Sequence, residues 1–271
     1  MAATWLSRSE PQEGLTGRKD MLETLLVLLT AHLVADFVLQ TTKMIARKQE
    51  LHGLLLHVAV VLLVIAALTG SINPWVYLII GFSHAVMDWI KVHWLPDGVH
   101  AFVIDQLVHI AFIVSIALMF PHVARNGWYG MIPTQVQLLM YQGMSIASGL
   151  ILVVNVGGVL VEKLLAPFTA GLNMGSAESA PTTAAVQGDD HKGMQTAGRY
   201  IGRLERGLIF MFLLLGQPEG VGLMLAAKSV LRFADRQARA HTEYVIIGTM
   251  LSFGWAIAAT MLTKLAISHW R

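Results

Sequence analysis

The segment Ala31–Gln40, AHLVADFVLQ, places three polar side chains in an otherwise apolar stretch. His32, Asp36 and Gln40 follow one another at intervals of four residues, so on a helix they form a single stripe. The surrounding span Met21–Leu39 is long and apolar enough to cross a bilayer. An aspartate near the centre of such a span costs about 2.5–3.5 kcal/mol. The segment therefore predicts a membrane helix in which a partner charge, a metal ion or a water-filled cavity compensates Asp36.

Histidines with an aspartate four residues away recur in the following apolar segments. SHAVMD at 83–88 has the histidine before the aspartate, whereas IDQLVH at 104–109 has the reverse order. A further histidine lies within Leu54–Leu68. The histidines and aspartates of these four segments, called here the His–Asp group, are His32, Asp36, His57, His84, Asp88, Asp105 and His109.

The composition is that of a membrane protein. Of the 271 residues, 55% are hydrophobic and only 13% are charged, whereas a soluble domain carries about 25% charged residues. The net charge of +2 is too small to indicate a nucleic-acid partner, and the absence of cysteine excludes disulfides and thiolate metal sites. We predict an all-α, polytopic transmembrane helical bundle of about seven or eight spans, with the lipid bilayer as its partner.

Polar or glycine-rich segments separate the predicted spans. The spans are Met21–Leu39, Leu54–Thr69, Pro74–Val92, Ala101–Phe120, Gln142–Leu165, Ile201–Leu215 and Glu243–Ala266, with Val221–Phe233 as either a short eighth crossing or an interfacial helix. Residues 1–20 form a polar tail, and the Gly-, Ser-, Thr- and Ala-rich stretch 171–197 has the composition of a flexible linker. The predicted division is therefore a four-helix unit with the His–Asp group over 21–120, a fifth span within 121–170, and a C-terminal membrane unit over 198–271.

Basic residues predict which ends of the spans face the cytoplasm. Lys43, Arg47 and Lys48 follow the first span and Lys91 ends the third, whereas the opposite loop at 70–73 carries no charge. Counted from the cytoplasmic ends at about 1.5 Å per residue, the histidines of the His–Asp group lie about 10–16 Å deep and the aspartates about 5–10 Å. Polar residues placed by chance would scatter over both halves of the membrane. We therefore predict that the first four helices form a bundle in which the four histidines point at one another.

Imidazole and carboxylate groups are ligands for Zn²⁺, Fe²⁺ or Mn²⁺, and the His–Asp group is large enough for two ions. A bound divalent ion brings the pKa of its water to near 7 and supplies hydroxide for hydrolysis of a phosphoester, ester or amide. This chemistry favours a metal-dependent hydrolase acting at the cytoplasmic leaflet. All seven residues are candidate metal ligands, and Asp36, Asp88 or Asp105 is the candidate general base. Gln40 is a candidate for hydrogen-bond support of Asp36.

Two other interpretations use the same residues, so the sequence leaves open whether the protein is an enzyme. The group can relay protons or ions in a transporter. It can also lock the helices together in a non-catalytic scaffold, with each histidine paired to its aspartate, Asp88 neutralised by Lys91, and Gln40 only ending its helix. Bound metal in the purified protein separates the hydrolase from the transporter or proton pathway.

The C-terminal part carries two stripes of basic residues on predicted helices. The first stripe comprises Arg199, Arg203 and Arg206, and the second begins with Lys228 and Arg232. Such stripes fit contacts with anionic lipid head groups or a phosphate clamp. Glu205 is displaced around its helix from Arg199 and is predicted to pair with Lys228 on a neighbouring helix.

The motifs AHLVADFVLQ, LLLHV, SHAVMDWIK and DQLVHI together resemble a bacterial membrane family catalogued as a domain of unknown function, number 3307. This resemblance covers about residues 21–120. The later segments GRYIGRLERGLIF, AAKSVLRF and EYVIIGTMLS resemble the C-terminal extension of its longer members. The resemblance implies a multi-pass protein of the bacterial inner membrane and no particular activity. SHAVMD is also similar to the histidine–aspartate box of bacterial membrane-bound metal-dependent hydrolases, which implies a divalent metal at this segment.

Overall fold

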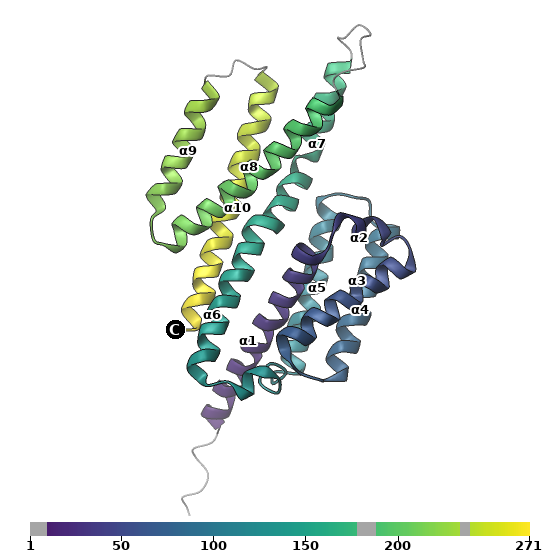
Figure 1. Ribbon diagram of the computed structural model, residues 1–271, viewed down its shortest axis with the longest axis vertical. Helices are drawn as coiled ribbons and strands as arrows, with labels where there is room; N and C mark the ends of the chain where they lie inside the picture. Colours follow the sequence, from purple (N-terminus) through teal and green to yellow (C-terminus); the bar gives the residue numbers. More distant parts are fainter. Residues whose placement is uncertain (1–9, 178–187, 234–238) are drawn as a thin grey trace, which may run out of the picture. The chain divides into compact units, whose positions relative to one another are not determined.

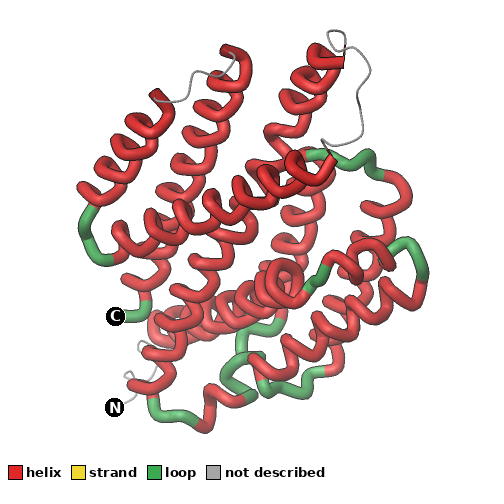
Figure 2. Tube along the Cα trace, turned by 45° about the horizontal axis from the view of Figure 1, so that its top comes forward, coloured by secondary structure: helices red, strands yellow, loops and turns green. Residues whose placement is uncertain are grey.

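The computed structural model describes residues 10–177, 188–233 and 239–271. These residues form helices joined by loops (Figure 2), which confirms the predicted all-α class. Contacts between residues divide the chain into two units, one of residues 1–148 with 267–271 and the other of residues 149–266.

The first unit is built from the N-terminal helices. They are α1 (Glu10–Val34), the π-helical turn η1 (Ala35–Leu39), α2 (Thr42–Arg47), α3 (Leu51–Thr69), α4 (Pro74–Trp94), α5 (Val99–Met119), the 3-10 turn η2 (Trp128–Met131) and α6 (Thr134–Ile151). Local sequence explains two of these boundaries. At the start of α4, the side chain of Asn73 accepts a hydrogen bond from the backbone N–H of Trp75. Pro74, the residue between them, is of a type favoured in the first helical turn. Gly70 ends α3 with a φ of +62°, which a glycine adopts without a steric penalty.

The helices α1, α3, α4 and α5 form a closed ring in which each packs against two neighbours (Figure 1). This arrangement confirms the predicted four-helix bundle. The apolar core of the ring comprises Leu28, Ala31, Ala35, Val61, Ile65, Val76, Ile80, Ile113, Ile116 and Val123. On the inner face of each helix, a histidine lies one turn away from the apolar core residues. His32 follows Leu28 by four residues in α1, and His109 precedes Ile113 by four residues in α5. The ring therefore has an apolar part and a polar part at different depths.

The loop after α5 is anchored to the beginning of the first membrane helix. Thr24 Oγ1 donates to the carbonyl of Pro121 at 2.6 Å and accepts from the backbone of Ala124 at 3.2 Å. The buried carboxylate of Asp20 pairs with Arg125 at 3.2 Å. Because buried polar groups require partners, these contacts hold the loop at the apolar end of the ring.

Five helices among the described residues are long and apolar enough to cross a membrane, so the prediction of seven or eight spans is wrong. The five are Thr16–Leu39, Leu51–Thr69, Val99–Met119, Thr134–Phe168 and Val245–His269. The predicted spans Pro74–Val92 and Ile201–Leu215 are not among them, and α9 (Pro218–Phe233), which contains the uncertain crossing Val221–Phe233, has only 16 residues. In α4, tryptophans, histidines, Asp88 and Lys91 lower the mean hydropathy. This helix nevertheless packs against two candidate spans, α3 and α5.

The second unit continues with η3 (Leu152–Val156), α7 (Gly157–Ala177), α8 (Gly188–Leu214), α9 and α10 (Arg239–His269). Its apolar core comprises Val153, Ile209, Phe210, Leu213, Phe253, Ala256 and Ala259. The buried Arg206 donates to the carbonyl of Val154 at 3.0 Å and to Ser252 Oγ at 3.2 Å. The ends of α7 and α8 extend into the predicted linker 171–197, and residues 178–187 of that stretch lie outside the described part of the chain.

Candidate functional site

The His–Asp group lies on the inner faces of the four helices of the ring. Its seven side chains are between 0 and 7% exposed. His32 belongs to α1 and Asp36 to the π-helical turn η1, so the regular spacing of AHLVADFVLQ is interrupted between them. Such π-helical turns are frequent at functional sites.

The four histidine rings are close neighbours. The rings of His84 and His109 are nearly parallel, with their centroids 4.1 Å apart, and the ring centroids of His57 and His84 are 5.0 Å apart. His32 lies 5.3 Å from His109. The prediction that the histidines point at one another is confirmed.

Three donor atoms have the separations of a tetrahedral metal site. The Nε2 atoms of His57 and His84 are 3.0 Å apart, and Asp36 Oδ1 lies 3.4 and 3.5 Å from them. In a tetrahedral zinc site with bonds of about 2.0–2.1 Å, two ligand atoms are about 3.3–3.4 Å apart. Asp36 Oδ1 is buried without a hydrogen-bond partner, which is costly unless another group compensates it. The residues present therefore fit a divalent ion.

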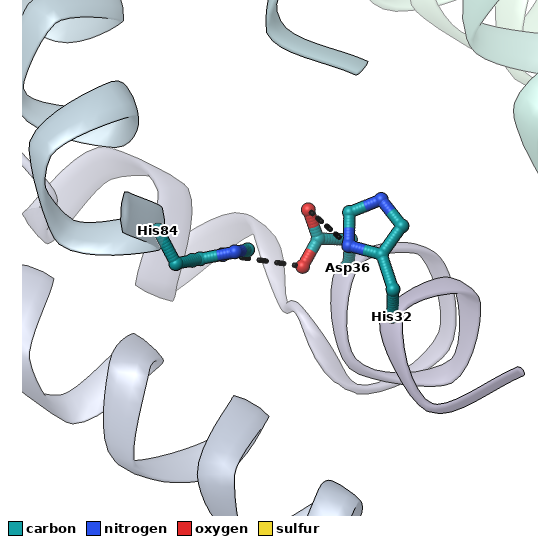
Figure 3. A group of neighbouring side chains, drawn as sticks. All are labelled: His32, Asp36 and His84. Carbon is teal, nitrogen blue, oxygen red and sulfur yellow. Dashed lines mark ion pairs between the residues drawn. The ribbon is translucent and has the colours of Figure 1, made fainter. Parts of the chain in front are cut away.

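Asp36 lies between His84 and His32, with an ion pair to each marked in Figure 3. Its distance to His32 Nδ1 is 3.9 Å, too long for a direct hydrogen bond. The other nitrogen of His32 donates to Gln106 Oε1 at 3.2 Å. In the neutral ring this leaves the lone pair of Nδ1 on the side of Asp36, where it can bind a metal ion or a proton.

Asp88 is a fourth donor next to the same two imidazoles. Its Oδ2 lies 3.5 Å from His57 Nε2 and 3.6 Å from His84 Nε2. The same oxygen accepts from Lys48 Nζ at 2.7 Å, and Lys48 is itself buried. The sequence assigned Lys48 only to the cytoplasmic flank of the first span, so this ion pair was missed.

A second set of donors lies next to the first. Asp88, Asp105 and His109 each offer a ligand atom within 4.8 Å of the others. Asp105 Oδ1 lies 3.3 Å from His109 Nε2, and both atoms lack a hydrogen bond of good geometry. The other oxygen of Asp105 accepts from Lys91 at 2.5 Å. Lys91 therefore pairs with Asp105 and not, as the scaffold interpretation expected, with Asp88.

The charges of the group do not cancel. Asp88 pairs with Lys48 and Asp105 with Lys91. Asp36 has only histidines as ionisable neighbours among the ion pairs of the described residues. A divalent cation or a protonated histidine therefore has to compensate the remaining carboxylate.

Two glutamines complete the surroundings. Gln106 donates to Asp105 Oδ2 at 3.0 Å while accepting from His32, a role that its position next to Asp105 in IDQLVH could have indicated. Gln40 Nε2 lies 3.2 and 3.3 Å from the ring nitrogens of His57. The expected support of Asp36 by Gln40 is therefore corrected to a contact with His57, because Gln40 follows the π-helical turn in an extended conformation.

A small cavity lies on the apolar side of the histidines. Its volume of about 10 Å³ is room for roughly one water molecule. His32, His84, His109 and Ser83 line it together with apolar residues of the ring. The cavity therefore gives the His–Asp group a small space that the side chains leave free.

The basic residues of the second unit have separate partners. Arg199 pairs with Glu162 at 3.2 Å, and Lys228 pairs with Glu205 at 2.5 Å, which confirms the predicted contact between helices. Arg203 is exposed, Arg206 is buried, and the side chain of Arg232 lies outside the described residues. A role of these residues with head groups or phosphate stays a prediction.

The match to a known family falls on the segment that holds the site. Residues 24–138 match the model of the family DUF3307, described as a protein of unknown function. The expected likeness is confirmed for this segment, which contains the whole His–Asp group. No curated protein and no solved structure matches the chain. The likeness to metal-dependent hydrolases thus gains no support from these comparisons.

Proposed function

We propose that the His–Asp group binds a divalent metal ion and that the protein is a metal-dependent hydrolase of the membrane. The observation that carries this proposal is the triangle of His57 Nε2, His84 Nε2 and Asp36 Oδ1, with separations of 3.0–3.5 Å. Two histidines and one carboxylate are a ligand set of catalytic zinc, which keeps its fourth position for water or substrate. The unpartnered oxygen of Asp36 supports the same assignment.

Asp88 and Lys48 have positions suited to proton transfer. When bound, the metal supplies an acidic water molecule and polarises the bond to be cleaved. Asp88 lies beside both imidazoles and accepts the proton of the attacking water. The ion pair at 2.7 Å with Lys48 holds the Asp88 carboxylate in this position. Asp105 and His109, with Asp88 shared, can hold a second ion.

The position of Lys91, at the end of the ring predicted to face the cytoplasm, supports access of a substrate to the His–Asp group from that leaflet. The Lys91 side chain is 32% exposed, whereas its partner Asp105 is buried. A polar substrate group entering at this end meets the Lys91–Asp105 ion pair before it reaches the histidines. Water-excluding walls around the group strengthen its electrostatic interactions.

Metal content and hydrolysis, measured on the same preparations, test the proposal. We expect wild-type protein purified without chelator and supplemented with Zn²⁺ or Mn²⁺ to retain metal and to cleave soluble ester or phosphoester reporters. His84→Ala should lose both properties. His93→Ala is the control, since His93 is an exposed histidine of the same helix outside the group. Metal-free wild type, or metal without any hydrolysis, would refute the hydrolase.

A pathway for protons or ions is the second candidate, and one feature of the site favours it. The three sets of metal-ligand donors overlap, because one pair of sets shares His84 and another shares Asp88. Such a chain of ionisable groups within apolar helices suits a relay. Uptake of protons or Zn²⁺ into proteoliposomes, lost in His84→Ala and unaccompanied by hydrolysis, would favour the transporter.

A further inference from the structure

An apolar groove of about 700 Å³ lies on the surface of α4 and α5. Its walls include Trp75, Phe82, Val86 and Ile90 from α4, and Val108 and Phe112 from α5. Ser83 is the polar residue among those that line it. Trp75 and Phe82 are 63 and 75% exposed, so the groove is open to the surroundings of the helices.

The groove has the dimensions and the environment of a lipid chain. From Trp75 to Ile90 the lining residues of α4 extend over about 22 Å along the helix. This is longer than one leaflet of the hydrocarbon core, which measures about 15 Å. The other wall, α5, is a candidate membrane span. A long apolar occupant therefore fits the groove, and the bilayer supplies acyl chains of that kind.

The groove borders the small cavity next to the His–Asp group. Ser83 and Phe112 line both the groove and the small cavity that His32, His84 and His109 line. Two further wall residues, Met87 and Val108, immediately precede Asp88 and His109 in the sequence. The side chains of Ser83 and Phe112 therefore lie between an occupant of the groove and the small cavity that His84 of the candidate metal site lines.

We propose that the groove binds one acyl chain of a membrane phospholipid and that an acyl ester is the substrate class of the His–Asp group. The second part rests on the proposed hydrolase. An ester is chosen because it is the first polar group that an acyl chain presents. Hydrolysis adds one water: its oxygen bonds to the acyl carbon, the bond from that carbon to the alcohol oxygen breaks, and the alcohol takes up a proton. The products are a fatty acid and a lysophospholipid, and no oxidant or reductant is required.

Photolabelling tests the binding part in the full-length protein in nanodiscs. The probe is a phosphatidylcholine that carries a diazirine in one acyl chain. We expect labelled peptides from α4 and α5, and roughly tenfold less labelling in Val86→Trp, since the indole displaces about two methylene groups of the chain. Leu63→Trp is the control, because Leu63 is exposed on α3 and does not line the groove. Equal labelling of exposed apolar residues on α3 and α4, or no effect of Val86→Trp, would overturn the proposed site.

Hydrolysis measured on the same variants separates this inference from the hydrolase itself. We expect Val86→Trp to cleave phosphatidylcholine roughly tenfold more slowly, with metal content and cleavage of a soluble short-chain ester unchanged. Cleavage of the soluble ester but not of phosphatidylcholine would overturn the substrate class and leave the hydrolase standing. If the groove is labelled but metal-loaded protein cleaves neither substrate, the proposed hydrolase activity is refuted and the proposed lipid-binding site is retained.

Discussion

Replacing Asp36 by asparagine distinguishes a metal site from a purely structural polar cluster. The change keeps the shape of the side chain and removes its charge. In the metal-free protein it replaces a buried charged carboxylate, whose Oδ1 has no hydrogen-bond partner, by a neutral amide that is easier to bury. We therefore expect metal-free Asp36→Asn to be more stable than metal-free wild type by about 1–3 kcal/mol in free energy of unfolding.

The response to metal should change in the opposite direction. Removing a residue that merely orients a metal ligand costs 10–100-fold in affinity, so losing Asp36 itself should cost at least about 100-fold, or about 2.7 kcal/mol. At a free metal concentration of about 1,000 times the wild-type Kd, wild type gains about 4.1 kcal/mol. The variant, with its weaker binding, gains only about 1.4 kcal/mol under the same conditions.

The assay is denaturant-induced or thermal unfolding of both proteins in one detergent, with chelator and with added Zn²⁺, beside metal content by mass spectrometry. Asp20→Asn is the matched control. Asp20 is another buried aspartate of the same unit and pairs with His122 and Arg125. Its loss should lower stability in both conditions and leave the metal-induced gain at the wild-type value. Equal gains in wild type and Asp36→Asn, or no gain in either, would refute the metal site and favour the polar lock.

Three further substitutions test contacts of the first unit. Lys48→Met leaves Asp88 buried without its ion-pair partner, so the free energy of unfolding should fall by about 3–5 kcal/mol. It should largely recover in the double variant with Asp88→Asn, whereas a single variant as stable as wild type would contradict the ion pair. Thr24→Val removes both hydrogen bonds to the loop after α5, and denaturant unfolding should show a loss of about 1–3 kcal/mol. Gly70→Ala places a Cβ at a φ of +62° and 2.4 Å from the Trp128 ring. It should cost more than about 1 kcal/mol and alter the tryptophan fluorescence, and wild-type stability would exclude this close packing.

The number of membrane spans shows one limit of reading hydropathy along the chain. Hydropathy depends on a local window, so α1, α3 and α5 could be predicted from their apolar residues. The polar residues that α4 contributes to the site lower its hydropathy below that of its neighbours. The histidine and aspartate of SHAVMD, and not hydropathy, are what placed this helix in the predicted bundle, and it packs against α3 and α5 in the ring.

Sequence alone predicted that the His–Asp group lies in the cytoplasmic half of the membrane, with each histidine and its aspartate on one face of a helix, because helical period and rise are local properties. The order His32 to Asp36 in one helix and Asp105 to His109 in another was enough to predict a common site. Which atoms meet was decided by the tertiary structure. Lys48 reaches Asp88 from 40 residues away, and Asp36 stands beside His57 and His84 on a π-helical turn. Such partners depend on how the helices rotate and pack against one another, and no local pattern of residues specifies that rotation.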